Sequence, residues 1–416
     1  MDIGSLIAAA LLSLGLIGTD AAINAGNIIF EVGVTRKLAD RGYTAPVVDA
    51  LLDNDLKQIV EFRSMVHRTR IRSADQKSIV GSIAESLSLK DVTAAFQAEF
   101  GFDSIRLVGS LMDGETGEFH FLLAGDSQHT GKFAIDMTSG DNQPLPAFLH
   151  DVAEAIAKRL EPYAVAVEKF NALQRKDQHT QNDADHESFV RYVTRQLKNE
   201  SDSGSEGDDR AAFYNLLGMA SLLYHEHACA AQQFGQAARS DPALGVPQLN
   251  LALLALVDRH FDDALRLSVA AMQAPEVARQ PFLLANVHTI AGLALWGRQD
   301  PAGAAAQFRA AVTAYPGSMW GYFYWSELEK ILGNADSADL LRSRAEYNLA
   351  VFESYPEVAL MYVRLYPEDG FRFTRVDIQR AHHLSDLEPV AGRSDPADAA
   401  TATATATATP QHDCGQ

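Results

Sequence analysis

A five-residue pattern recurs in the second half of the chain, and it constrains the fold more than any other feature of the sequence. Gly218 is followed after 12, 16, 19 and 24 residues by Ala, Phe, Ala and Pro, and Gly292 is followed by the same residues at the same intervals. Because Phe and Pro are scarce, with 20 and 15 copies in 416 residues, the recurrence indicates a repeated structural unit. The two sets are Gly218, Ala230, Phe234, Ala237 and Pro242, and Gly292, Ala304, Phe308, Ala311 and Pro316.

Two weaker units share this frame. One follows the first unit at an offset of 34 residues, and the other follows the third at the same offset; the third is displaced by 40, so about six residues near Arg279 are extra. Ser268 replaces Phe in the second unit, while the fourth has Arg342 there and no Pro, as suits a terminal unit. Their small positions are Ala252, Ala264 and Ala271, and Ser326, Ala338 and Ala345.

Helix packing explains these residue types. Small residues at facing positions let two antiparallel helices approach closely, a Phe fills the space toward the next unit, and Pro stops the second helix. A 34-residue helix-turn-helix period with this pattern resembles the tetratricopeptide repeat family over roughly residues 211–354. The resemblance implies a groove for a protein or peptide partner along the first helix of each hairpin, with no catalytic residue and no cofactor.

The resemblance also assigns the groove positions of this chain. Asn offers both a donor and an acceptor, so this groove suits an extended peptide backbone, whereas the Lys and Arg clamp for a peptide carboxylate is missing. Packing between helices is the competing interpretation for each side chain. The positions are Asn215, Met219 and Leu222, Asn250 and Leu253, Asn286, Thr289 and Leu293, and Trp320, Phe323 and Glu327.

Metal and redox chemistry have weak support. His225, Glu226 and His227 do not have the spacing of a zinc protease, and we place them at the exposed turn of the first hairpin. No metal site is expected. Cys229 and Cys414 lie far apart, the second in a tail without a core, so no disulfide is expected and the redox compartment stays open.

Residues 27–173 have the pattern of a small α/β domain. A β-rich run at residues 28–34 precedes a helix capped by Thr44 with Pro46 in its first turn. A second helix at 87–101, three strand-like runs and one long closing helix follow, which predicts an α+β fold with helices on one face of a mainly antiparallel sheet. Residues 42–59 resemble the opening of an α/β module found ahead of repeats in some bacterial envelope proteins.

The remaining segments complete a five-part organisation. Residues 1–26 form an apolar helix, and three interpretations stay open: a membrane anchor through residues 3–17, a signal, or a helix packed on the next domain. A membrane-associated or envelope location is thus favoured over the cytoplasm. A polar linker with a short helix occupies 174–210, the repeats with a capping helix occupy 211–370, and a disordered low-complexity tail occupies 371–416. The repeats are expected at 211–244, 245–278, 285–318 and 319–352.

The charge balance narrows the function. A formal net charge of −19 argues against a nucleic-acid partner, because phosphate binding needs clustered cations. We therefore predict a helical-repeat solenoid behind an α+β domain, acting as a non-enzymatic scaffold for a protein or peptide partner. The alternative is an α/β domain that senses a ligand or performs catalysis under control of the repeats. Self-association stays open.

Overall fold

The computed structural model describes residues 27–62, 64–66, 72–73, 105–114, 117–127, 131–175, 183–203, 209–352, 355–376, 381–387 and 414. The chain divides into two compact units, residues 1–62 with 69–165 and residues 63–68 with 166–416. The helices expected at 1–26 and 87–101 lie outside the described residues. Within those residues, no helix combines the length and apolar character needed to cross a membrane.

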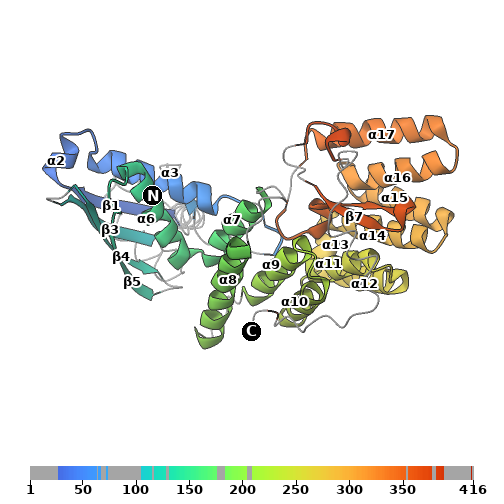
Figure 1. Ribbon diagram of the computed structural model, residues 1–416, viewed down its shortest axis with the longest axis horizontal. Helices are drawn as coiled ribbons and strands as arrows, with labels where there is room; N and C mark the ends of the chain where they lie inside the picture. The colour runs from blue at the N-terminus through green and yellow to red at the C-terminus, as the bar shows by residue number, and fades with distance from the viewer. Residues whose placement is uncertain are drawn as a thin grey trace, which may run out of the picture. The chain divides into compact units, whose positions relative to one another are not determined.

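The first unit is a five-stranded sheet with helices on one face (Figure 1). The strand order is β2-β1-β3-β4-β5, in which β1 is parallel to β2 and β3, while β3, β4 and β5 are antiparallel. Its elements are β1 (Asn27–Val34), α2 (Arg36–Ala39), α3 (Ala45–Val60), β2 (Arg72–Ser73), β3 (Ile105–Asp113), β4 (Phe119–Ser127), β5 (Gly131–Thr138) and α6 (Leu145–Leu160).

Alternation along the strands orients this sheet. Leu107 and Phe121 are fully buried toward α3 and α6, while Val108 and Leu122 on the opposite face are exposed. Thr44 precedes α3 as expected, but its side chain makes no capping hydrogen bond, so the helix start depends on the proline in its first turn.

The long closing helix expected after β5 is two helices. Pro162 lacks an amide hydrogen and disfavours helical backbone at Glu161, whose φ of −139° and ψ of 65° end α6. The second helix, α7 (Pro162–Arg175), and α8 (Asp183–Ser203) continue the chain, and α8 is much longer than the short linker helix expected. The boundary expected between residues 173 and 174 lies between 165 and 166.

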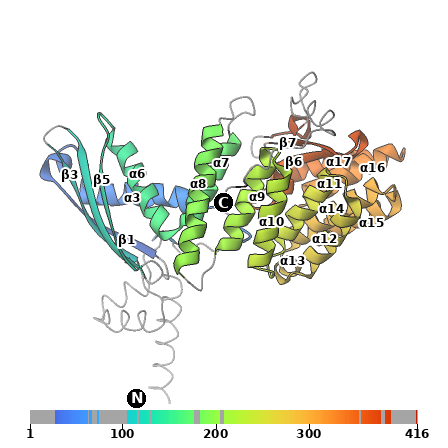
Figure 2. The same ribbon diagram turned by 60° about the horizontal axis from the view of Figure 1, so that its bottom comes forward.

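The second unit is a helical-repeat array of four stacked hairpins in the described residues (Figure 2). The turn residue before each second helix has a positive φ at His225, Arg259, Gln299 and Gly333, which reproduces the offsets of 34, 40 and 34 residues. The insertion is the short helix α13 (Pro275–Arg279). The hairpins are α9 (Arg210–Leu223) with α10 (His227–Ser240), α11 (Val246–Val257) with α12 (Phe261–Gln273), α14 (Pro281–Gly297) with α15 (Pro301–Ala314), and α16 (Met319–Ile331) with α17 (Ala335–Leu349).

The chain after α17 differs from expectation. The predicted capping helix in residues 355–366 is wrong, because this stretch contains a 3-10 turn and a strand that pairs with β7. Part of the tail predicted to be disordered is ordered. Figure 2 shows β6 and β7 beside the helices of the repeats. The elements are η2 (Ala359–Met361), β6 (Val363–Tyr366), η3 (Pro367–Asp369), β7 (Arg372–Arg375) and η4 (Leu384–Leu387).

Candidate functional site: a groove that binds its own chain

The groove is formed by the first helices of the hairpins, α9, α11, α14 and α16, and residues 355–376, here called the groove segment, lie in it. Two asparagines bind the main chain of this segment. The Nδ2 atoms of Asn215 and Asn250 lie 3.0 and 2.8 Å from the carbonyl oxygen of Glu357. The amide of Ala359 donates to Asn250 Oδ1 at 2.9 Å. Asn250 thus satisfies a donor and an acceptor of the segment together.

The fourth hairpin binds the same segment further along. The amide of Leu365 donates to the Tyr324 hydroxyl at 3.0 Å, and burial of that hydroxyl raises the pKa of Tyr324. The Arg364 guanidinium lies 4.7 Å from the ring centre of Phe323 and 4.6 Å from that of Tyr366. Stacking on aromatic faces favours a buried Arg, so this cation is accommodated with only 5% of its surface exposed.

Aromatic contacts fix the far end of the groove segment at the hairpin turns. Phe371 packs on Phe261 with ring centres 4.9 Å apart, and Phe373 packs on His225 at 5.1 Å. His225 has a φ of 62° in the turn between α9 and α10, where the sequence places it. His227 contacts Phe373 too, and its Nδ1 lies 2.8 Å from Asp258 Oδ1.

The other groove positions expected from sequence are buried or have partners within the repeats. Asn286 and Thr289 bind carbonyl oxygens of their own helix, at Phe282 and Ala285. Glu327 forms an ion pair of 2.9 Å with Arg342. Positions that are at most 1% exposed, and so belong to the core, are Met219, Leu222, Leu253, Leu293, Trp320 and Phe323.

The Gly-to-Phe spacing that recurs in the first and third repeats has a direct steric cause. A Cβ atom at Gly218 would lie 2.5 Å from Phe234, and one at Gly292 would lie 2.5 Å from Phe308, so neither position accepts a side chain without displacing the ring. Pro242 and Pro316 follow the ends of α10 and α15. The repeat alanines, all fully buried, are Ala230, Ala237, Ala304 and Ala311.

The expectation of unpaired cysteines is wrong. Cys229 on α10 forms a disulfide with Cys414, and their Cα atoms lie 5.5 Å apart. Separation along the chain, 185 residues here, does not limit separation in space in a folded protein. Residue 414 is also bound through its carbonyl oxygen, which accepts from Gln233 Nε2 at 3.1 Å.

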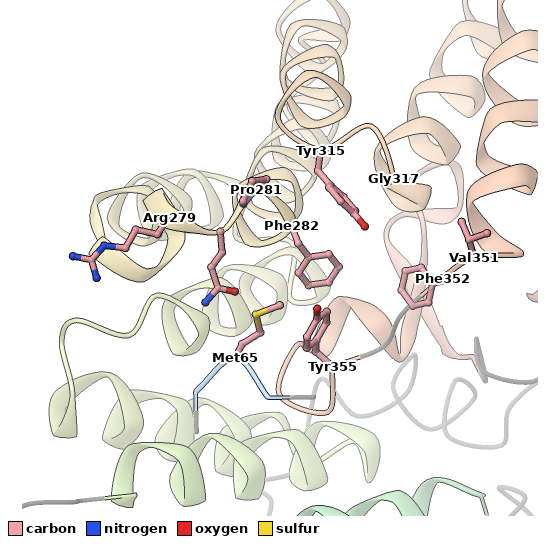
Figure 3. Close-up of a pocket in the computed structure, with 10 residues that line it drawn as sticks. Met65, Arg279, Pro281, Phe282, Tyr315, Gly317, Val351, Phe352 and Tyr355 are labelled. Atoms are coloured by element: carbon pink, nitrogen blue, oxygen red, sulfur yellow. The ribbon is translucent and has the colours of Figure 1, made fainter. Parts of the chain in front are cut away.

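A pocket of about 300 Å³ lies where the groove segment begins (Figure 3). Phe282 lies at its centre, 5.9 Å from the ring of Tyr315 and 4.7 Å from that of Tyr355, and Met65 points toward the same rings. Arg279 lines the pocket but points away from these rings. The pocket suits an apolar side chain from a protein.

In the first unit, two side chains bind the carboxylate of Asp113. Lys37 Nζ lies 2.7 Å from Asp113 Oδ2, the Thr35 hydroxyl donates to Oδ1 at 2.7 Å, and these bonds, led by that of Lys37, lower the pKa of Asp113. They join the start of α2 to the end of β3. This arrangement is explained by fold stability.

One sequence signal could have revealed the groove segment. Residues 367–370, Pro-Glu-Asp-Gly, lie between two strand-like runs, and Gly370 adopts a φ of 68° there. This is the turn chemistry of a hairpin. No local signal places that hairpin in the groove, because its partners lie far from it in the chain: Tyr324 precedes Leu365 by 41 residues, and Phe261 precedes Phe371 by 110.

Comparisons with known proteins add little to this description. No protein-family model and no curated protein matches the chain. The solved structure "MamA 41-end from Desulfovibrio magneticus RS-1" is 14% identical, with 45% of this chain and 98% of that chain covered and a TM-score of 0.32. A "Crystal structure of MamA" is also 14% identical, with 40% and 90% covered and a TM-score of 0.32. The helical-repeat assignment therefore rests on the hairpins themselves.

Proposed function

We propose that this chain is a non-enzymatic scaffold that binds a segment of a protein partner in the groove of its helical repeats. The observation that carries the proposal is the pair of asparagines bonded to the main chain of Glu357 and Ala359. Hydrogen bonds to main-chain atoms are independent of side-chain identity, so a partner segment of different sequence would find the same bonds.

The groove segment acts in this proposal as an internal ligand. Burial of each of its apolar side chains stabilises the bound segment by roughly 1.5–3 kcal/mol. The state in which the segment has left and the groove is empty is therefore scarcely populated. A partner enters by exchange, and it must supply comparable apolar surface and main-chain bonds. The apolar side chains concerned, all at most 1% exposed, are Val358, Leu360, Met361, Val363 and Leu365.

The aromatic pocket gives the exchange a starting point. Tyr355 is the first described residue of the groove segment and also lines the pocket, so an incoming side chain packed on Phe282 contacts the segment at its edge. The Arg279 guanidinium, which lines the pocket and points away from its rings, favours a partner with an acidic residue beside its apolar anchor.

The test weakens the internal ligand without altering the groove. In the full chain, Leu365→Asp places a charge at a buried position of the segment, and binding of a labelled peptide of residues 355–376 is measured by fluorescence anisotropy. We expect at least about tenfold tighter binding than in the unsubstituted chain. Leu340→Asp is the matched control, because Leu340 is 74% exposed on α17 and outside the groove.

A second substitution identifies the groove as the binding surface. Adding Asn250→Ala to the Leu365→Asp chain removes one donor and one acceptor, and we expect about tenfold weaker peptide binding. A Leu365→Asp chain that keeps its helical circular dichroism but does not bind the peptide refutes the proposal. If Leu365→Asp does not fold, Leu365→Ala replaces it with the same expected direction.

A further inference from the structure

Strand β5 forms an open edge of the sheet in the first unit (Figure 1). It pairs with β4 on one side, and no strand of the described residues pairs with it on the other. An open edge is a template for a further strand, and folded proteins commonly protect such edges with charges or a proline. β5 is eight residues long and contains no proline, and its charged residues are Lys132 and Asp136. What this edge can bind therefore depends on these two charges.

The pairing with β4 fixes the direction of the main-chain groups of β5. The amide of Ser139, one residue after β5, donates to the carbonyl oxygen of Phe119 at 2.8 Å. Antiparallel ladders alternate between pairs that exchange main-chain hydrogen bonds and pairs that do not. Counting back from Ser139, the amides and carbonyls of Lys132, Ala134 and Asp136 point away from β4, toward the open edge.

The side chains of these three residues share one face of the strand, because side chains alternate between the two faces. All three are exposed, on the face of the sheet that α6 does not cover. Lys132 lies opposite Asp126 on β4, whereas Asp136 lies opposite the apolar Leu122. Four residues of strand span about 13 Å, so Lys132 and Asp136 are too far apart to pair within one chain.

We propose that the outer edge of β5 pairs with β5 of a second copy of this chain, antiparallel and about a two-fold axis at Ala134. In this register Ala134 lies opposite the partner's Ala134, Lys132 lies opposite the partner's Asp136, and Asp136 lies opposite the partner's Lys132. These are the residues whose main-chain groups point outward, so each pair can exchange two hydrogen bonds. Two of the three pairs also place opposite charges across the junction.

The charges select both the register and the partner. With the axis one residue to either side, at Phe133 or Ile135, Lys132 lies opposite Ala134 or Thr138 and has no carboxylate across the junction. An extended strand of another protein could satisfy the same main-chain groups. The pattern of one cation and one anion placed symmetrically about a small residue is, however, complementary to itself, as a two-fold interface requires.

The area of the junction sets the strength of association. Pairing along one strand buries less than the about 800 Å² per partner of a typical stable interface, so we expect a weak dimer with a dissociation constant on the order of 10 µM. The junction lies in the first unit and the groove in the second, so the inference does not depend on what the groove binds. A dimer carries two grooves, which favours a partner with repeated segments.

Charge reversal in the full chain tests the junction, with mass measured by sedimentation equilibrium. Lys132→Asp and Asp136→Lys each place like charges opposite one another in both charged pairs, and each should weaken self-association at least about tenfold. An equimolar mixture of the two variants restores opposite charges in both pairs and should associate as the unsubstituted chain does. Asp141→Lys is the matched control, because it reverses the same charge in the exposed turn after β5.

Three results would overturn the junction. The first is an unsubstituted chain that stays monomeric at about 200 µM, well above the expected dissociation constant. The second is self-association of either single variant that matches the unsubstituted chain. The third is a mixture that stays monomeric although both variants keep their circular dichroism. Peptide binding by Leu365→Asp tests the groove alone, so failure of either proposal leaves the other standing.

Discussion

The hairpins and the groove segment are both well buried, yet their stabilising contacts have different ranges along the chain. Gly218 packs on Phe234 and Gly292 on Phe308, so the first and third hairpins are each fixed by residues 16 positions apart. The groove segment is fixed by Asn215 and Asn250, which precede Glu357 by 142 and 107 residues. A hairpin can therefore form from local sequence, while the segment needs an assembled array before it has anything to bind.

The largest expected effect tests the difference between the hairpins and the groove segment. Phe308→Ala removes a fully buried ring from the third hairpin and should lower the free energy of unfolding by about 3–5 kcal/mol, measured by urea denaturation. Leu365→Ala in the groove segment should speed hydrogen exchange of residues 355–376 while α14 and α15 stay protected. If Leu365→Ala instead loses protection equally in the segment and in the hairpins, the two unfold together. The difference drawn between the hairpins and the groove segment would then not hold.

A smaller effect is expected from Glu276 of α13, which lies near both the repeat helices and Glu357 of the groove segment. Burial raises the pKa of Glu276 to about 7 against the hydrogen bond from the Gly245 amide, and the nearby Glu357 carboxylate adds to the shift. Since the pKa is raised in the folded state, the stabilisation is complete below pH 4.5 and is lost as the pH rises through about 7.

The unfolding free energy should accordingly fall by about 2–3 kcal/mol between pH 5 and pH 8. Glu276→Gln cannot ionise, so it should flatten this dependence and stabilise the chain at pH 8. Urea titrations of both proteins at the two pH values measure the difference. An unchanged slope in the variant would assign the pH dependence to other groups.

The smallest effect on stability is expected from the N-terminal caps of single helices. The Asp300 side chain accepts a hydrogen bond of 2.9 Å from the Gly303 amide and caps α15, whereas Thr44 caps α3 without such a bond. Asp300→Ala should cost about 1 kcal/mol of stability, and Thr44→Ala only a few tenths. Thermal denaturation of the two variants compares them directly, and equal losses would contradict the assignment of the caps.

The sequence predicted the local structure of both units to a useful degree. The offsets of 34, 40 and 34 residues reappear as the positive-φ turns at His225, Arg259, Gln299 and Gly333. Strands β1, β3, β4 and β5 and helices α3 and α6 appear in the predicted order, although the sequence revealed neither β2 nor that β1 is parallel to β3. Pairing direction depends on how the connection between strands crosses the sheet, and that path is a property of the assembled fold.

The groove shows where prediction from the sequence stops. Asn215 and Asn250 were placed in the groove by the resemblance to a helical-repeat family, and binding of a peptide backbone was expected from their amide groups. Their ligand in the structure was not predicted, because the groove segment carries only a weak hairpin signal, and its residues 355–366 were predicted to be part of a capping helix.

The amino-acid sequence by itself determined the period of the repeats and the Gly–Phe packing pairs of the first and third hairpins. These depend on contacts over a few helical turns, which side-chain size and spacing specify directly. Only the tertiary structure decided that residues 355–376 fill the groove and that Cys229 meets Cys414. Both depend on bringing together parts of the chain that share no local pattern, so the energy that selects them appears only after the array has formed.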